Sequence, residues 1–299
     1  MTRKRLVYLS ACGTAALLLP LLTGCEGTPG NGNGPTGEPT EIRITTSIDA
    51  IAKAPQLDQN GAGNFAPGDR FALNIAADGF ESVLKNYTVG STELFWEDLG
   101  LPDAAGTVNF SGCYPWPEAV REGAFTFTAP STADKDLLLA KAVRTDKGSV
   151  KPVKLAFSHA LHKLAVRYVS DGSYSDEELA GVVTSLRALS SCTVDLEKGE
   201  ILEGTQTAEA ETDEVSGKEV AFLLVPQPKD GVALNVRFKG IDKTFLLPAA
   251  TTEGIPLTRL EGGKTLTVEL TVAKDGIRID ASQIGGWNSQ GNIDGEIII

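Results

Sequence analysis

The sequence predicts an all-β protein made of antiparallel β-sandwiches. Apolar and polar residues alternate in many short runs, as at Phe71, Leu73 and Ile75, and this period of two is typical of strands with one buried face. Each run ends in turn-forming residues, such as Pro67-Gly68-Asp69 and Lys274-Asp275-Gly276. No alternation of strands with long helices is visible, so a parallel sheet of the β-α-β type is not expected.

The runs follow one another along the whole chain at the spacing of hairpins. In chain order they are Glu41–Ile48, Phe71–Ile75, Val108–Phe110, Phe125–Phe127, a long strand starting at Val153, Val220–Leu224, Val232–Phe238, Leu266–Val272 and Ile277–Ile279. One segment has a different pattern. Ser175-Asp176-Glu177-Glu178 is a capping box, and Leu179 and Val182 follow at helical spacing. Because the next residues alternate again, we expect a short helical turn that gives way to a strand.

The N-terminus has the pattern of an export signal. Three basic residues, Arg3 to Arg5, precede an apolar run from Leu6 to Leu22 that is shorter than a membrane-spanning helix requires. The run closes with Leu22-Thr23-Gly24-Cys25, which resembles the bacterial lipobox. We therefore expect residues 1–24 to be a lipoprotein signal peptide and Cys25 to be the lipidated residue, with an ordinary signal peptide as the alternative.

The rest of the chain divides into a tether and two expected domains. Residues 25–40 are rich in Gly, Pro and Asn and lack large apolar side chains, so they are expected to be a flexible tether. A polar break at Thr145–Ser149 suggests a boundary between an N-terminal β-sandwich at 41–150 and a C-terminal one at 151–299. Domains of this size match the usual range.

The charge argues against nucleic acid as a partner. The chain has 27 Lys and Arg and 39 Asp and Glu; without the three basic signal residues, 24 basic residues remain and the net charge is near −15. Such a surface repels phosphate backbones, and no basic cluster with interleaved aromatic residues is present.

Residues that could support catalysis or metal binding form no convincing site. His159 and His162 could chelate a metal on a helix, but on the expected strand their rings point to opposite faces, which favours a structural role. Cys113 and Cys192 could form a disulfide after export, although two buried thiols are favoured. The segment at Gly262–Thr265 lacks the first glycine of a phosphate loop and is interpreted as a turn. The segment at 58–63 departs from a calcium loop. We expect no catalytic residue, no metal and no cofactor, and therefore no enzyme.

Several short motifs in order resemble those of the fimbrillin family. They are Phe65–Asp69 leading into Phe71–Leu73, Cys113-Tyr114-Pro115-Trp116, Asp136–Ala140, Phe157–Leu164, Leu223-Leu224-Val225-Pro226-Gln227, Leu246–Pro248, the Gly263-Lys264 turn, and a terminal Trp287 followed by Gly291 and Ile293. Members of this family are lipoprotein precursors of type V fimbrial subunits in Gram-negative anaerobes. The resemblance implies two transthyretin-like antiparallel β-sandwich domains in tandem, and a location at the outer membrane and in the fimbrium.

The resemblance also implies an assembly mechanism. A trypsin-like protease removes the lipidated segment with the first strand, and a donor strand from another fimbrial subunit replaces it. The matching loop after the first strand reads Ala52-Lys53-Ala54, with Lys53 where the family has arginine, and Arg43 is a second candidate within the strand. The alternative is a surface lipoprotein that stays anchored in the outer membrane and binds glycan or host protein without polymerising.

Overall fold

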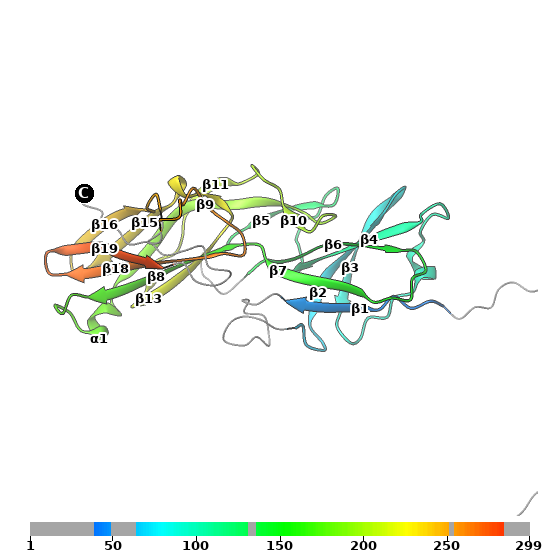
Figure 1. The fold of residues 1–299 in the computed structure, drawn as a ribbon, viewed down its shortest axis with the longest axis horizontal. Coiled ribbons are helices and arrows are strands. Elements are labelled where there is room, and N and C mark those ends of the chain that lie inside the picture. The colour runs from blue at the N-terminus through cyan, green and yellow to red at the C-terminus, as the bar shows by residue number, and fades with distance from the viewer. Residues whose placement is uncertain (1–38, 49–63, 131–135, 251–253, 284–299) are drawn as a thin grey trace, which may run out of the picture. The chain divides into compact units, whose positions relative to one another are not determined.

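The chain folds almost entirely into β-strands. The computed structural model describes residues 39–48, 64–130, 136–250 and 254–283, and the side chains up to residue 278 (Figure 1). The described residues, which begin at Pro39, belong to one compact unit. Among the described residues, no helix has the length and apolar character needed to cross a membrane.

The first sheet has six strands in the spatial order β1-β7-β6-β4-β2-β3. Their bounds are β1 Ile44–Ile48, β2 Arg70–Ala77, β3 Phe80–Thr88, β4 Thr107–Tyr114, β6 Leu138–Asp146 and β7 Val153–His159. The alternation of β2 directs Phe71, Leu73 and Ile75 to one face, where they meet Trp96 and Leu99 of the 3₁₀ helix η1 (Trp96–Leu99) in the first core.

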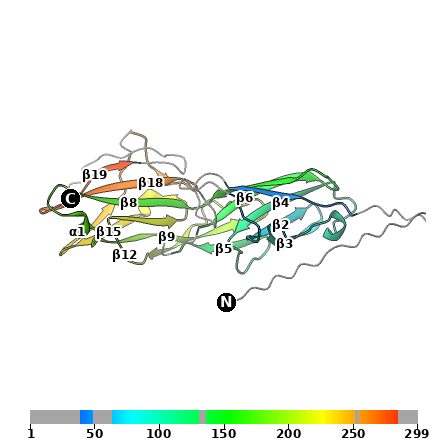
Figure 2. The same ribbon diagram turned by 90° about the horizontal axis from the view of Figure 1, so that it is seen from below.

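Two further sheets enclose a second core. In one sheet the long strand β9 is central, and in the other the order is β13-β8-β18-β19; Figure 2 shows them as two layers. The strands of the first are β5 Ala124–Thr128, β9 Val183–Asp195, β10 Glu200–Ile201, β11 Thr207–Glu211, β12 Val215–Ser216, β15 Ala233–Phe238 and β16 Ile241–Leu246. Those of the second are β8 His162–Ser170, β13 Glu219–Leu224, β18 Thr265–Ala273 and β19 Gly276–Gln283. Tyr168, Leu234 and Leu270 are among the buried residues between the sheets.

Strand β9 connects the second core to a third core, which also contains residues of the first sheet. Its N-terminal half contributes Leu186 to the second core, whereas Cys192 and Val194 lie in a third core with Ala72 and Leu139 of the first sheet. Strands β14 (Gln227–Pro228) and β17 (Arg259–Leu260) form a small two-stranded sheet. The 3₁₀ helix η2 (Lys229–Gly231) follows β14 directly.

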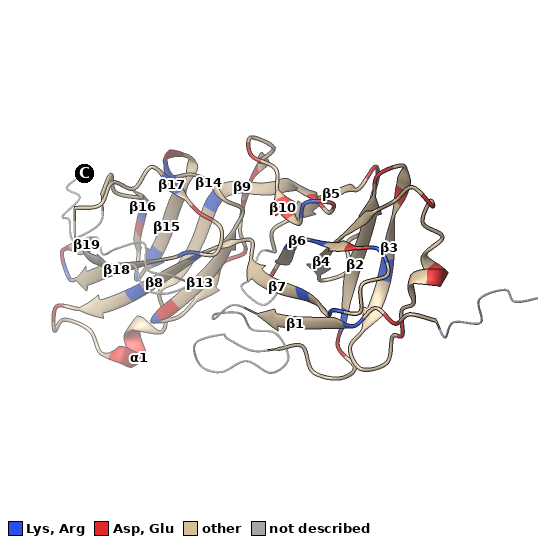
Figure 3. Ribbon diagram, turned by 45° about the vertical axis from the view of Figure 1, so that its right-hand side comes forward, with Lys and Arg blue, Asp and Glu red and all other residues tan. Residues whose placement is uncertain are grey.

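Most local predictions are confirmed. The helix α1 spans Asp176–Leu179; Ser175 and Glu178 form both hydrogen bonds of the capping box, and β9 follows. The three acids of its first turn, which suit a helix N-terminus, appear red in Figure 3. Gly262-Gly263 is a turn before β18, as expected.

In the described part of the chain the sheets are predominantly antiparallel, with two parallel pairs. β1 runs parallel to β7, and β8 runs parallel to β18. In both pairs the partners are far apart in sequence, which allows the long crossover that a parallel pair requires. Local hairpin spacing therefore predicted the antiparallel neighbours and gave no signal for these two.

The expected domain boundary at 150/151 falls between two strands of the same sheet. Both β6 and β7 belong to the first sheet, whereas β5, from the N-terminal half of the chain, pairs with β9. The division into 41–150 and 151–299 stays a prediction. The polar residues at 145–149 lie in the connection between β6 and β7, and the chain changes sheet at Ala160-Leu161.

Candidate functional site: the first strand and its docking surface

Residues 39–48, here called the first-strand segment, lie along the edge of the first core. The start of the segment hydrogen-bonds to the chain where η1 begins: Ile42 N donates to Leu94 O at 2.7 Å, and Trp96 N donates to Thr40 O at 3.0 Å. The segment then continues as β1, which pairs in parallel with β7 from Ile44 opposite Val153 to Ile48 opposite Phe157 (Figure 1). It is thus held by two different partners.

The apolar face predicted for this segment is buried. Ile42 and Ile48 are each 4% exposed and Ile44 is half-buried; all three pack in the first core. Thr45 and Ser47 point the other way and are exposed. Burying an isoleucine side chain stabilises the fold by about 1.5–3 kcal/mol before entropy is counted, so the segment contributes several kcal/mol.

The segment occupies an edge position. β1 is the last strand of its sheet in the described part of the chain, and only β7 pairs with it there. Without the segment, the edge of β7 and the backbone at Leu94–Trp96 would be left unpaired, and the apolar side chains around Ile42 and Ile48 would be uncovered. Such an edge can accept another strand.

Of the two candidate processing residues, Arg43 and Lys53, Arg43 lies among the described residues. Arg43 lies within the segment; its carbonyl accepts a hydrogen bond from Val153 N at 2.8 Å, and its guanidinium donates to Val150 O at 2.8 Å. Its side chain is exposed but its backbone is already paired. Lys53 and the predicted lipidation residue Cys25 lie outside the described residues.

The two histidines belong to different strands. His159 ends β7 and His162 begins β8, so a single strand carrying both is not what forms. Both are buried; His159 Nδ1 hydrogen-bonds to the Asp136 carboxylate, and His162 Nδ1 donates to Glu261 O at 2.9 Å. Burial lowers the pKa of His162 to about 4. In the described part of the chain, no group of three or more His, Cys, Asp or Glu side chains is placed to hold a metal ion.

The two described cysteines are buried free thiols in the third core, as predicted. Burial raises the pKa of both Cys113 and Cys192 to about 12, so neither forms the reactive thiolate at neutral pH. They act as small apolar side chains.

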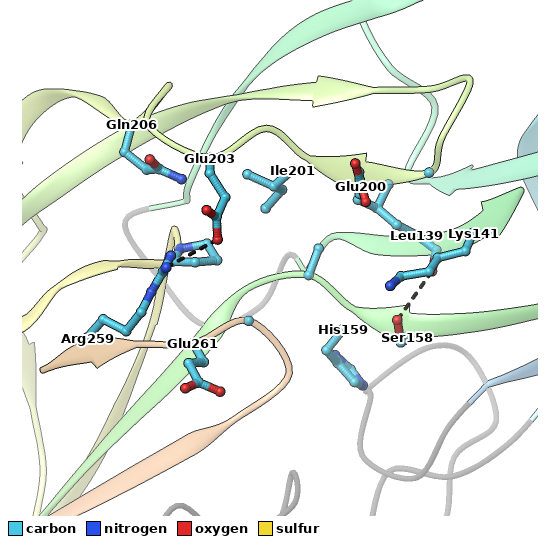
Figure 4. Close-up of a pocket in the computed structure, with 14 residues that line it drawn as sticks. Leu139, Lys141, Ser158, His159, Glu200, Ile201, Glu203, Gln206, Arg259 and Glu261 are labelled. Atoms are coloured by element: carbon cyan, nitrogen blue, oxygen red, sulfur yellow. Dashed lines mark hydrogen bonds and ion pairs between the residues drawn. The ribbon is translucent and has the colours of Figure 1, made fainter. Parts of the chain in front are cut away.

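A pocket of about 440 Å³, here called the junction pocket, was not predicted from the sequence. Strands β6 and β7, the residues from Gly199 to Gln206 and the loop at Arg259–Gly262 line it (Figure 4). Its polar side chains include Lys141, Ser158, Glu200, Glu203, Gln206 and Arg259. They come from separate segments of the chain, so no local motif marks them.

The comparisons with known proteins agree with the fold. A family model described as fimbrillin-like matches residues 72–287. No curated protein matches the chain. Among solved structures, a proposed cell adhesion protein from Bacteroides uniformis is similar with a TM-score of 0.57 and 20% identity, covering 82% of this chain and 99% of that one. A second, from Bacteroides ovatus, has a TM-score of 0.55 and 15% identity, covering 88% and 100%. At these identities the structures show the fold alone, but the family model matches more than half of the chain, and the chain therefore belongs to the fimbrillin-like family.

Proposed function

We propose that this protein is a structural subunit or adhesin of a bacterial cell-surface fimbrium, without catalytic activity. In this proposal it is exported as an outer-membrane lipoprotein and assembles when proteolysis releases the first-strand segment and a donor strand from another subunit takes its place. Membership of the fimbrillin-like family supports the fimbrial role. The position of the first-strand segment supports the assembly mechanism.

The observation that carries the mechanism is the way this segment is attached. It contributes buried isoleucines to the first core, and among the described residues its backbone bonds run to β7, to the Leu94–Trp96 stretch and to the Glu97 carboxylate. A strand of this kind can be replaced by another strand with alternating apolar residues, because the backbone bonds are independent of sequence and the pockets need only apolar side chains of similar size.

Lys53 is the better candidate for the processing site. A protease binds its substrate as an extended chain and forms backbone hydrogen bonds with it, so residues already paired in a sheet are poor substrates. The Arg43 backbone is paired to Val153 N. Cleavage after Lys53 would leave the whole of β1 on the released fragment, as the mechanism requires.

Lipidation at Cys25 places the precursor in the outer membrane. The sequence before it, Leu22-Thr23-Gly24, supports this part of the proposal. Cys25→Ser should abolish labelling of the precursor by a palmitate analogue and release it from membranes, whereas Cys12→Ser should leave labelling unchanged. Unchanged labelling of Cys25→Ser contradicts the lipoprotein assignment.

Strand exchange is tested with a lysine-specific protease. The chain is nicked, freed of the first-strand segment, and compared with the intact protein and with Lys53→Gln treated in the same way. The nicked protein should melt at a lower temperature and form oligomers, and a peptide copying residues 39–48 should restore its melting temperature. The Lys53→Gln variant should not be cut after residue 53 and should stay monomeric.

Equal stability of the nicked and intact proteins, both as monomers, contradicts the mechanism. The alternative function, an anchored lipoprotein that binds glycan or host protein without polymerising, would then be favoured. The N-terminal sequence of the protein recovered from the cell surface separates the two, because only a polymerising subunit loses the first-strand segment.

A further inference from the structure

The junction pocket has walls that are fixed by close backbone contacts. A Cβ atom added to Gly199 would lie 2.1 Å from Ala140 O, and one added to Gly262 would lie 2.5 Å from Ala160 O. Both glycines line the pocket. The turn after β9 is also bonded to β6, since Ala142 N donates to Lys198 O at 3.1 Å. The pocket is therefore formed by packed elements of the fold and is present before any ligand arrives.

The lining offers hydrogen-bond donors and acceptors together. Glu200 and Glu203 supply carboxylate oxygens, and Gln206 supplies an amide with both functions. Glu203 accepts a hydrogen bond from Arg259 at 3.2 Å in an exposed ion pair (Figure 4). Lys141 is exposed and, among the described residues, has no ion-pair partner.

The charge and polarity of the lining narrow the class of ligand. With Glu261 the pocket has three carboxylates against the cations of Lys141 and Arg259, an excess of negative charge that disfavours anionic ligands. Leu139, Ile201 and Pro226 add apolar surface. A pocket of this volume falls in the usual range for small-molecule sites.

We propose that the junction pocket binds a neutral, hydroxyl-rich sugar residue. Each sugar hydroxyl both donates and accepts, so it can bond to Glu200 or Glu203 on one side and to Lys141 or Gln206 on the other. The C–H face of the ring can pack on Ile201 and Pro226. The site would give the protein an adhesive function that does not depend on strand exchange, because none of its residues lies in the first-strand segment.

Saturation-transfer NMR and titration with glucose, galactose and N-acetylglucosamine test the proposal. The protein used is the chain from residue 25 onwards carrying Cys25→Ser, and glucuronate serves as the anionic comparison. At least one neutral sugar should bind saturably with a Kd near the millimolar range, and glucuronate should bind at least tenfold more weakly. Lys141→Ala and Glu200→Gln should each weaken binding at least tenfold.

Lys154→Ala is the matched control, since Lys154 is an exposed lysine of β7 that does not line the pocket. The Lys154→Ala variant should bind the neutral sugar with the same affinity as the unsubstituted protein. Unchanged melting temperatures should show that all variants are folded. The proposal is overturned if none of the three neutral sugars binds. It is also overturned if Lys141→Ala and Lys154→Ala bind the sugar equally well, or if glucuronate binds more tightly than the neutral sugars. None of these outcomes changes the result of the nicking experiment, so the two proposals fail separately.

Discussion

The side-chain amide of Gln227 pairs with the backbone of Leu189 as another strand would. Leu189 N donates to Gln227 Oε1 at 2.8 Å, and Gln227 Nε2 donates to Leu189 O at 3.1 Å and to Val225 O at 3.0 Å. Along this edge of β9, β15 pairs with Val183–Arg187 and β5 with Ser191–Asp195. Gln227 therefore fills the gap between two strands and makes the edge continuous.

Gln227→Leu should destabilise the protein by about 2–4 kcal/mol. Gln227 is 1% exposed, and its loss would leave the backbone groups of Leu189 and Val225 O buried without partners. Urea unfolding followed by circular dichroism measures the effect. The control is Gln206→Leu at a half-exposed position, which should change the free energy of unfolding by less than about 0.5 kcal/mol. Equal effects of the two substitutions would contradict the role given to Gln227.

Gly199→Ala should destabilise the protein more than Gly204→Ala. Both glycines have a positive φ, +68° and +72°, so alanine costs about 1–2 kcal/mol at either position. At Gly199 the new Cβ would also collide with Ala140 O, whereas nothing lies within 4 Å of it at Gly204. The difference between the two variants in thermal or urea unfolding therefore measures the close contact of the β9–β10 turn with β6. Equal destabilisation would show that this contact relaxes freely.

Ile48→Ala should lower the free energy of unfolding by about 2–4 kcal/mol, because it removes a side chain that is 4% exposed in the first core. Ser47→Ala, on the exposed face of the same strand, should have an effect below about 0.5 kcal/mol. The pair separates side-chain burial from backbone pairing, which both variants keep. A small effect of Ile48→Ala would mean that the first-strand segment contributes little to the precursor and that its release could not expose a site for a donor strand.

The stability of the protein should fall as the pH drops from about 6.5 to about 4, because His162 takes up a proton more readily in the unfolded chain than in the folded one. Burial lowers the pKa of this group to about 4 in the folded state, against 6.5 in the unfolded chain. Between these values the unfolded chain binds a proton that the folded chain does not, so acid favours unfolding, with a slope of at most about 1.4 kcal/mol per pH unit. Below pH 4 this contribution becomes constant.

His162→Gln isolates the effect of the histidine from that of the carboxylates. The difference in the free energy of unfolding between the unsubstituted protein and the variant should increase with pH between 4 and 6.5 and be flat above about pH 7. Urea titrations at several pH values measure this difference. A difference that does not depend on pH would contradict the low pKa of His162.

The sequence predicted those features that are encoded by neighbouring residues. Alternation located β2, β15 and β18, and the capping box at Ser175 and Glu178 located α1, because each pattern is complete within a few residues. The polar stretch at 145–149 was interpreted as a boundary, although such residues also form the turn between two strands of one sheet.

Features that depend on distant residues could not be predicted in this way. The pairing of β5 with β9 and the role of Gln227 depend on segments that are dozens of residues apart, and a single glutamine carries no pattern. The same holds for the junction pocket. The apolar face of Ile42, Ile44 and Ile48 was visible in the sequence, but its two backbone partners were not.

The continuity of β9 has a mechanical consequence for a protein of a surface appendage. β15 and β5 are bonded to the two halves of one strand of 13 residues, so a pull along β9 that draws them apart loads their hydrogen bonds in shear. Bonds loaded in this way must break together, whereas bonds at the end of a hairpin open one at a time. Flow that drags on a cell held by such subunits would therefore be resisted by a single covalent backbone running through the second and third cores.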